Sequence, residues 1–190
     1  MPKKNKKYLG ETAMDETMSD FHFKLMSFGF KFRDFFKPRE NILEQAGIKP
    51  GFHVLDYGCG PGSYLTAAAE LVGKSGKIYA LDIHPLAIQK VKTIAAKKRL
   101  SNVVTINSDC KTWLPDNSID LVLLYDTFHS LSDPNRVLEE LHRILKTGGI
   151  LSFSDHHMNE NEILHAVING GLFKFFEEGK EIYNFIKEDQ

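Results

Sequence analysis

The chain has 190 residues, with 24 lysines and arginines against 25 aspartates and glutamates, so it fits one domain with a sizeable core and has no basic surplus that would call for nucleic acid. Its two cysteines, Cys59 and Cys110, match neither a zinc spacing nor a disulfide framework, which favours the reducing cytoplasm. No run approaches the roughly 18 apolar residues of a membrane span, and the lysine-rich start lacks the apolar core of a signal peptide.

The N-terminal part divides into a polar tail over residues 1–17 and an amphipathic helix expected over residues 20–36. Phenylalanines lie on its apolar stripe and also off it, so one packed face cannot bury them all. The second face could add to the core, cover a ligand, meet a partner or touch a membrane surface. We expect residues 1–37 to form a tail and helical cap, and residues 38–190 to form the main domain.

The chain is organised around residues 54–63, Val-Leu-Asp-Tyr-Gly-Cys-Gly-Pro-Gly-Ser. A buried strand here runs into a glycine turn and then into a helix from Ser63 to Gly73, which is the geometry of a nucleotide site. A dinucleotide fingerprint would require a third glycine where Ser63 stands. Asp56, two residues before Gly58, disfavours a phosphate and suits a cationic ligand. A nicotinamide-dependent oxidoreductase is therefore the less favoured interpretation.

These residues resemble the first motif of the class I S-adenosylmethionine-dependent methyltransferases, which reads hydrophobic-hydrophobic-Asp-x-Gly-x-Gly-x-Gly. The resemblance extends over about residues 40–190 and implies S-adenosylmethionine as the cofactor. Its sulfonium and ammonium groups are cationic, and it carries no phosphate. The short stretch Leu-Met-Ser-Phe-Gly-Phe at residues 25–30 also resembles the region before this motif in the ubiquinone and menaquinone C-methyltransferases.

The middle of the chain alternates strands and helices. A second strand is expected over residues 77–81, with Asp82 at its end. The separation in sequence between the glycine turn and Asp82 is close to ~20 residues, the spacing at which an acidic side chain reaches the ribose hydroxyls in a nucleotide site. A helix follows from Pro85 to about Arg99, then a strand over residues 103–107. The resemblance places Asp109, just after that strand, against the amino group of adenine.

The fourth strand, residues 120–125, is nearly all apolar, as expected of a strand buried on both faces. Its exit resembles the family's fourth motif, with Ser130 and Ser132 departing from it. A helix begins at Asp133 and Pro134 and is expected to stop at Gly148-Gly149, before a fifth strand over residues 150–154.

A last helix between Asn159 and Asn169 is followed by an antiparallel hairpin of residues 172–177 and 181–187. The fold class expected is α/β. It is a Rossmann-like doubly wound sheet, mostly parallel and seven-stranded, with a C-terminal antiparallel hairpin. The cofactor-binding residues that the resemblance implies are Asp56, Gly58, Cys59, Gly60, Asp82, Ile83, Asp109, Cys110 and Tyr125.

No catalytic residue is assigned from the sequence. A hydroxyl or acidic-carbon nucleophile would need a base, and His129 is the first candidate, with His156 or His157 behind it. All three follow strands at the carboxyl edge of the sheet, where open α/β sheets bind ligands. The run Asp155-His156-His157 lacks an outlying ligand at a recognisable spacing, so we expect no metal.

The resulting hypothesis is a cytoplasmic methyltransferase that uses S-adenosylmethionine on a small-molecule or lipid-like acceptor. No nucleic acid or transmembrane segment is expected, and peripheral membrane contact remains open. The alternative is a protein that binds the cofactor without catalysis, as a sensor or as the partner of an active subunit. The motifs do not separate these two.

Overall fold

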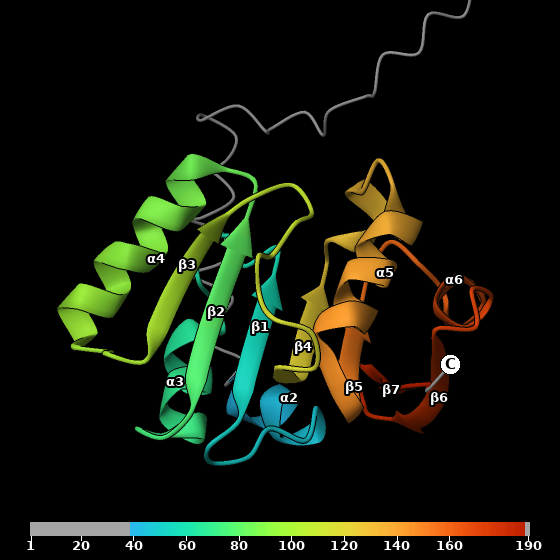
Figure 1. Ribbon diagram of the computed structural model, residues 1–190, viewed down its shortest axis with the longest axis horizontal. Coiled ribbons are helices and arrows are strands. Elements are labelled where there is room, and N and C mark those ends of the chain that lie inside the picture. The colour runs from blue at the N-terminus through green and yellow to red at the C-terminus, as the bar shows by residue number, and fades with distance from the viewer. Residues whose placement is uncertain (1–38, 189–190) are drawn as a thin grey trace, which may run out of the picture.

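The computed structural model describes residues 39–188, and the helix expected over residues 20–36 lies outside that range. Strands and helices alternate along most of the described residues, as Figure 1 shows. The elements are α2 (Glu40–Gln45), β1 (His53–Tyr57), α3 (Leu65–Val72), β2 (Lys77–Asp82), α4 (Pro85–Lys98), β3 (Val103–Asn107), β4 (Ile119–Tyr125), the 3-10 turn η1 (Phe128–Ser130), α5 (Pro134–Ile144), β5 (Leu145–Ser154), α6 (Glu160–Ile168), β6 (Phe173–Glu178) and β7 (Tyr183–Lys187).

The strands form one sheet in the order β3-β2-β1-β4-β5-β7-β6. Strands β1 to β5 are parallel, while β7 runs antiparallel to both β5 and β6. The expected fold class is thus confirmed. The chain starts at β1, moves outward to β3 and then returns to place β4 on the other side of β1. Such a reversal leaves a crevice at the carboxyl ends of β1 and β4, where ligands bind in folds of this kind.

Successive side chains of the central strands point to opposite faces of the sheet, so the apolar ones form two cores, one on each face. Val54, Leu121 and Leu123 pack with α2, α3 and α4, whereas Leu55 and Val122 pack with α5 and α6. Both faces of β1 and β4 are therefore covered, which explains their nearly continuous apolar sequence. No helix among residues 39–188 combines the length and apolarity needed to cross a membrane.

Two boundaries differ from the expectation. Helix α5 ends at Ile144 rather than at the glycine pair, and Leu145 already belongs to β5. Leu145 pairs with Ile119 and Ile150 pairs with Leu121, so the residues between them form a bulge that includes Gly148-Gly149. At the other boundary, α3 starts at Leu65 and not at Ser63, because residues 63 and 64 still have a turn conformation.

Helix α2 ties the beginning of the described chain to its end. The Gln45 side-chain oxygen accepts a hydrogen bond from the Lys180 amide at 2.7 Å, and the Gln45 carbonyl accepts one from Asn184 Nδ2 at 2.8 Å. These bonds hold the β6–β7 turn against α2, and the antiparallel pairing of β7 with β5 puts that turn at the carboxyl end of β5. Helix α2 and this turn therefore border the carboxyl edge of the sheet on one side.

Candidate active site

The three glycines of the turn have different neighbours, although all take positive φ values, of 74°, 50° and 84° for Gly58, Gly60 and Gly62. A Cβ on Gly58 would lie 2.3 Å from Thr127 Oγ1, and one on Gly62 would lie 3.3 Å from a Val91 methyl. A Cβ on Gly60 would meet nothing within 4 Å. Gly58 therefore packs against the exit of β4 and Gly62 against α4. Only Gly60 presents its α-carbon to open space.

Gly58→Ala should strongly destabilise the unliganded protein. A left-handed residue with a Cβ costs about 1 to 2 kcal/mol, and overlap with the β-branched Thr127 adds about 1 to 3 kcal/mol. Gly60→Ala is the matched control, since it carries only the first cost. Urea unfolding should show the larger loss for Gly58→Ala, and equal losses would contradict this account of the turn.

Asp82 fastens the glycine turn to the end of β2. It is 8% exposed, and its two carboxylate oxygens accept hydrogen bonds from the Gly60 amide at 2.8 Å and the His84 amide at 2.7 Å. Burial raises the pKa of Asp82 above its ordinary value, although these two bonds lower it in part. Each oxygen keeps a second lone pair for a ligand hydroxyl.

Asp56 lies at the end of β1, 4% exposed, and its Oδ2 has no hydrogen-bond partner. Burial, followed by the charge of Asp82, raises the pKa of Asp56 to about 7. A buried polar atom without a partner is uncommon in native structures and calls for an explanation. Two buried carboxylates beside the turn would repel a pyrophosphate and attract a cation, so the residues present fit S-adenosylmethionine better than a dinucleotide.

The remaining expected cofactor residues contribute differently. The side chains of Cys59 and Cys110 pack into the two cores, so only their main chain is available to a ligand. The Ile83 carbonyl accepts a hydrogen bond from an asparagine of β3 at 2.9 Å. Asp109 is exposed, and its carbonyl accepts the hydroxyl of Tyr57 at 2.7 Å, which holds the loop after β3 beside β1.

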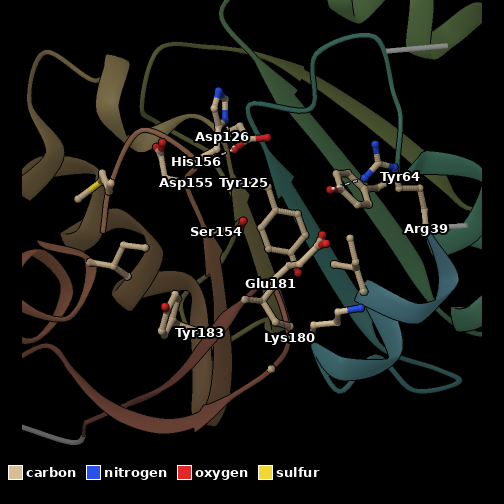
Figure 2. A pocket seen from close by; sticks show the side chains of 15 residues that line it. Arg39, Tyr64, Tyr125, Asp126, Ser154, Asp155, His156, Lys180, Glu181 and Tyr183 are labelled. Carbon is tan, nitrogen blue, oxygen red and sulfur yellow. Dashed lines mark hydrogen bonds and ion pairs between the residues drawn. The ribbon is translucent and has the colours of Figure 1, made fainter. Parts of the chain in front are cut away.

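Tyr125, the last expected residue, opens onto a cavity of about 500 Å³ at the carboxyl ends of β4 and β5, a volume typical of small-molecule sites. Its ring meets Tyr64 edge-on at 5.1 Å, and its hydroxyl bonds Ser152 at 2.8 Å. Figure 2 shows Tyr125 in the middle, with Tyr64 and Arg39 to one side. The lining residues are Arg39, Ile42, Tyr64, Tyr125, Asp126, Ser154, Asp155, His156, Met158, Ile163, Gly179, Lys180, Glu181, Ile182 and Tyr183.

Several of these residues were not foreseen. Tyr64 directly follows the glycine turn, so its place beside the site could have been inferred from that position alone. Arg39 precedes α2 and contacts Tyr64, with its guanidinium 4.9 Å from the ring centre. Nothing in the sequence pairs these two residues. Their approach depends on how α2 packs.

Two histidine–aspartate pairs follow β4 and β5. His156 Nδ1 lies 2.7 Å from Asp126 Oδ1, and His129 Nδ1 lies 2.9 Å from the Asp155 carboxylate. Burial raises the pKa of Asp155, but hydrogen bonds from the His129 ring and from the His129 and His157 amides outweigh it, so that pKa is lowered overall. His156 lines the cavity, whereas His129, the first candidate base, is not among its lining residues.

Ligand-capable atoms of Asp126, Asp155 and His156 lie within 4.8 Å of one another. The structure thus groups Asp126, and not His157, with the other two residues. Both carboxylates already accept hydrogen bonds from histidine rings and backbone amides, so their charges are partly compensated without a cation. We assign no metal to this group.

Comparison with known proteins agrees with this geometry. Residues 48–190 match the model of a methyltransferase domain family. A demethylmenaquinone methyltransferase of Geobacillus sp. (strain WCH70) is 31% identical over 129 residues, which is 67% of this chain and 55% of the relative. A ubiquinone/menaquinone biosynthesis C-methyltransferase of Hydrogenovibrio crunogenus is 32% identical over 61% of this chain and 48% of the relative. The chain thus spans about half the length of these curated relatives.

Among solved structures, a SAM-dependent methyltransferase from Aquifex aeolicus superposes with a TM-score of 0.70 at 28% identity, covering 85% of this chain and 97% of that one. S-adenosylmethionine is accordingly the cofactor that family and fold imply. The family match covers most of the chain, and the sheet order is that of the expected fold. The chain therefore belongs to the methyltransferase domain family, within the class I S-adenosylmethionine-dependent methyltransferases.

Proposed function

We propose that this chain transfers a methyl group from S-adenosylmethionine to a small, largely apolar acceptor held in the cavity beside Tyr125. The observation that carries the proposal is the position of this cavity. Tyr64 and Tyr125 line it, Tyr64 directly follows the glycine turn, and Tyr125 ends the strand next to that of Asp56. An acceptor bound there would adjoin a cofactor bound at the turn.

In the cofactor site we assign Asp82 to the ribose hydroxyls, Asp109 to the adenine amino group and the main chain around Gly60 to the methionine part. Asp56 faces the cationic end. The cofactor supplies an activated methyl group on sulfur. The residues of the chain orient the acceptor, exclude water and hold the cation, so alignment is their main contribution to the rate.

For the acceptor, we propose a lipid-like aromatic molecule that carries a hydroxyl group, such as a quinol. Relatives about 30% identical to this chain are a demethylmenaquinone methyltransferase and a ubiquinone/menaquinone biosynthesis C-methyltransferase. The cavity wall supports an aromatic ring, because three tyrosines and four aliphatic or thioether side chains line it. The charged residues of the wall are Arg39 and Lys180, which suit an ionised oxygen, and the acidic residues Asp126, Asp155 and Glu181.

The N-terminal cap, residues 1–37, lies outside the described residues, and Arg39 and Ile42, which come soon after it, belong to the cavity wall. We keep the division into a cap and a main domain of residues 38–190 as part of the proposal. We also propose a cytoplasmic enzyme without a nucleic-acid partner.

The proposal is tested with tritium in the methyl group of S-adenosylmethionine and a short-chain demethylmenaquinol as acceptor. We expect label to pass into the organic phase and to require both the protein and the acceptor. Cofactor binding without transfer to any quinol or phenol would favour the alternative, a non-catalytic cofactor-binding protein or partner subunit.

A further inference from the structure

We propose that His156 is the general base of this site and that Asp126 is its positioning residue, an inference that rests on the proposed function. The step is one proton transfer. The O–H bond of the acceptor breaks, its electron pair stays on oxygen, and an N–H bond forms at His156 Nε2. An ionised phenol or quinol is a far stronger nucleophile than its neutral form, so such an acceptor requires a base.

The hydrogen bonds of His156 leave one ring nitrogen available. Its Nδ1 lies 2.7 Å from Asp126 Oδ1, and its own amide donates to the same oxygen at 3.2 Å. A carboxylate accepts hydrogen bonds and cannot donate them, so Nδ1 carries the proton and Nε2 is a free acceptor. Two bonds to one oxygen also fix the ring relative to the backbone.

Asp126, the residue that binds the His156 ring, has an unusual backbone conformation. Its φ is +51°, a left-handed value that non-glycine residues seldom adopt, directly after β4. Its amide donates to the Ser154 carbonyl at 2.7 Å, which pins this strained residue to the end of β5. Strain of this kind persists where surrounding structure enforces it and is often found at functional sites. Here it accompanies a carboxylate placed to bind His156.

The neighbouring histidines have other roles. The Asp155 side chain is fully buried and binds both the ring and the amide of His129, so this pair joins η1 to the end of β5. The His157 ring lies between the rings of His156 and His129, with centroid-to-centroid distances of 4.0 Å and 4.1 Å. Neither His129 nor His157 lines the cavity, whereas the His156 side chain lines it and is 66% exposed.

The charged and titratable groups around His156 come from four elements. Asp126 follows β4, Asp155 and His157 follow β5, His129 lies in η1, and Lys180 and Glu181 form the β6–β7 turn across the cavity. Of these, only Asp126 is hydrogen-bonded to the His156 ring among residues 39–188. A change at Asp126 should therefore disturb the tautomer and orientation of the His156 ring more than a change at His157.

Three full-length variants test the assignment: His156→Gln, Asp126→Asn and the control His157→Gln. With a phenolic or quinol acceptor, His156→Gln should lower kcat by about 100-fold or more and remove the fall of kcat at low pH, while cofactor affinity stays unchanged. Asp126→Asn should reduce kcat less. The His157→Gln control should stay within a few-fold of the wild type.

A second measurement does not depend on turnover. In the complex with S-adenosylhomocysteine, we expect 1-naphthol, a phenol that resists redox chemistry, to shift the NMR signals of the His156 ring. The chemical shift of the ring Nδ1 should change in Asp126→Asn, because its carboxylate partner is lost. Chelation with EDTA should change neither result.

The experiments distinguish a wrong assignment of the base from a wrong proposed function. If wild type transfers methyl and His156→Gln is equally fast, or if 1-naphthol leaves the His156 signals unmoved, His156 is not the base, although the proposed function stands. Loss of activity in EDTA would likewise overturn the base and favour a metal at Asp126, Asp155 and His156. If wild type binds S-adenosylmethionine and methylates no acceptor, the proposed function fails and the base with it.

Discussion

Asp82→Ala is expected to weaken S-adenosylmethionine binding by at least about tenfold and up to about a thousandfold. The reason is that a carboxylate at the end of β2 can accept hydrogen bonds from both ribose hydroxyls. Bonds to a charged group contribute roughly 1.5 to 3 kcal/mol each. Calorimetric titration of wild type and variant measures the difference directly.

The same variant should also lose stability without ligand. A solvated carboxylate at the open end of a strand would add little to folding, but Asp82 is not solvated. In the structure it is 8% exposed and accepts the Gly60 and His84 amides. Leaving these two donors without an acceptor should cost about 1 to 3 kcal/mol of unfolding free energy.

Asp82→Asn should be intermediate in both cofactor affinity and stability. An amide retains one accepting oxygen and presents an NH2 group to the other backbone donor, so it should lie between wild type and alanine in both measurements. Unchanged cofactor affinity in Asp82→Ala would mean that the nucleotide site lies elsewhere. Unchanged stability would mean that the two hydrogen bonds contribute nothing.

Asp56→Asn should have opposite effects on stability and on binding. The pKa of Asp56 is about 7 in the folded chain, against an ordinary value of 3.8, because of burial and the nearby charge of Asp82. Since the folded state holds this proton more tightly than the unfolded state, the contribution of Asp56 to stability falls as the pH rises from about 4 to about 7. At pH 8 an ionised, buried Asp56 should cost about 2 to 4 kcal/mol.

An asparagine of the same shape carries no charge to bury. The melting temperature of unliganded Asp56→Asn should therefore exceed that of wild type at pH 8, and the gap should narrow at pH 5. Cofactor binding should weaken at least about tenfold, because the cationic ligand loses its buried counter-charge. In wild type the affinity should also fall as the pH drops below about 7, and in Asp56→Asn it should not.

Three neighbouring groups set the context for this pH dependence. Burial raises the pKa values of Asp56, of the Cys59 thiol and of the Tyr125 hydroxyl; the charge of Asp82 raises that of Asp56 further, and the charge of Asp56 raises those of Cys59 and Tyr125 further. The thiol and the phenol have raised pKa values and stay neutral through the pH range of the experiment, so neither obscures the titration of Asp56. Asp56→Asn less stable than wild type at pH 8 would contradict the raised pKa.

The regular parts of this fold were predictable because their signals are local. Helix α5 begins as expected, with Asp133 as its cap and Pro134 as its first residue. Helix α6 begins with Asn159 as its cap and Glu162 three residues later. The bulge in β5 was missed, since Gly148-Gly149 normally ends a helix and its actual role depends on pairing with β4. The residues near Gly148-Gly149 in the sequence do not reveal the pairing of β5 with β4.

The candidate site was predictable on the cofactor side and much less so on the acceptor side. Asp56, Gly60 and Asp82 come together because adjacent parallel strands end at one edge, which the strand order fixes. Gly58 was expected to face a ligand, but its α-carbon packs against Thr127, which follows a strand far along the chain. His156 rather than His129 lines the cavity, and Asp126, which is hydrogen-bonded to the His156 ring, has a left-handed backbone conformation that no sequence pattern reveals.

The central claim is that the carboxyl edge of β1 and β2 binds S-adenosylmethionine. The most direct test is the melting temperature of the full chain with S-adenosylmethionine, S-adenosylhomocysteine, NAD and NADH. At a hundredfold excess over the dissociation constant, a ligand that binds only the native state adds about 2.7 kcal/mol, or about 5 to 10 °C for a chain of this size. We expect this shift with the first two ligands and none with the dinucleotides, whereas a shift with the dinucleotides alone would contradict the assignment.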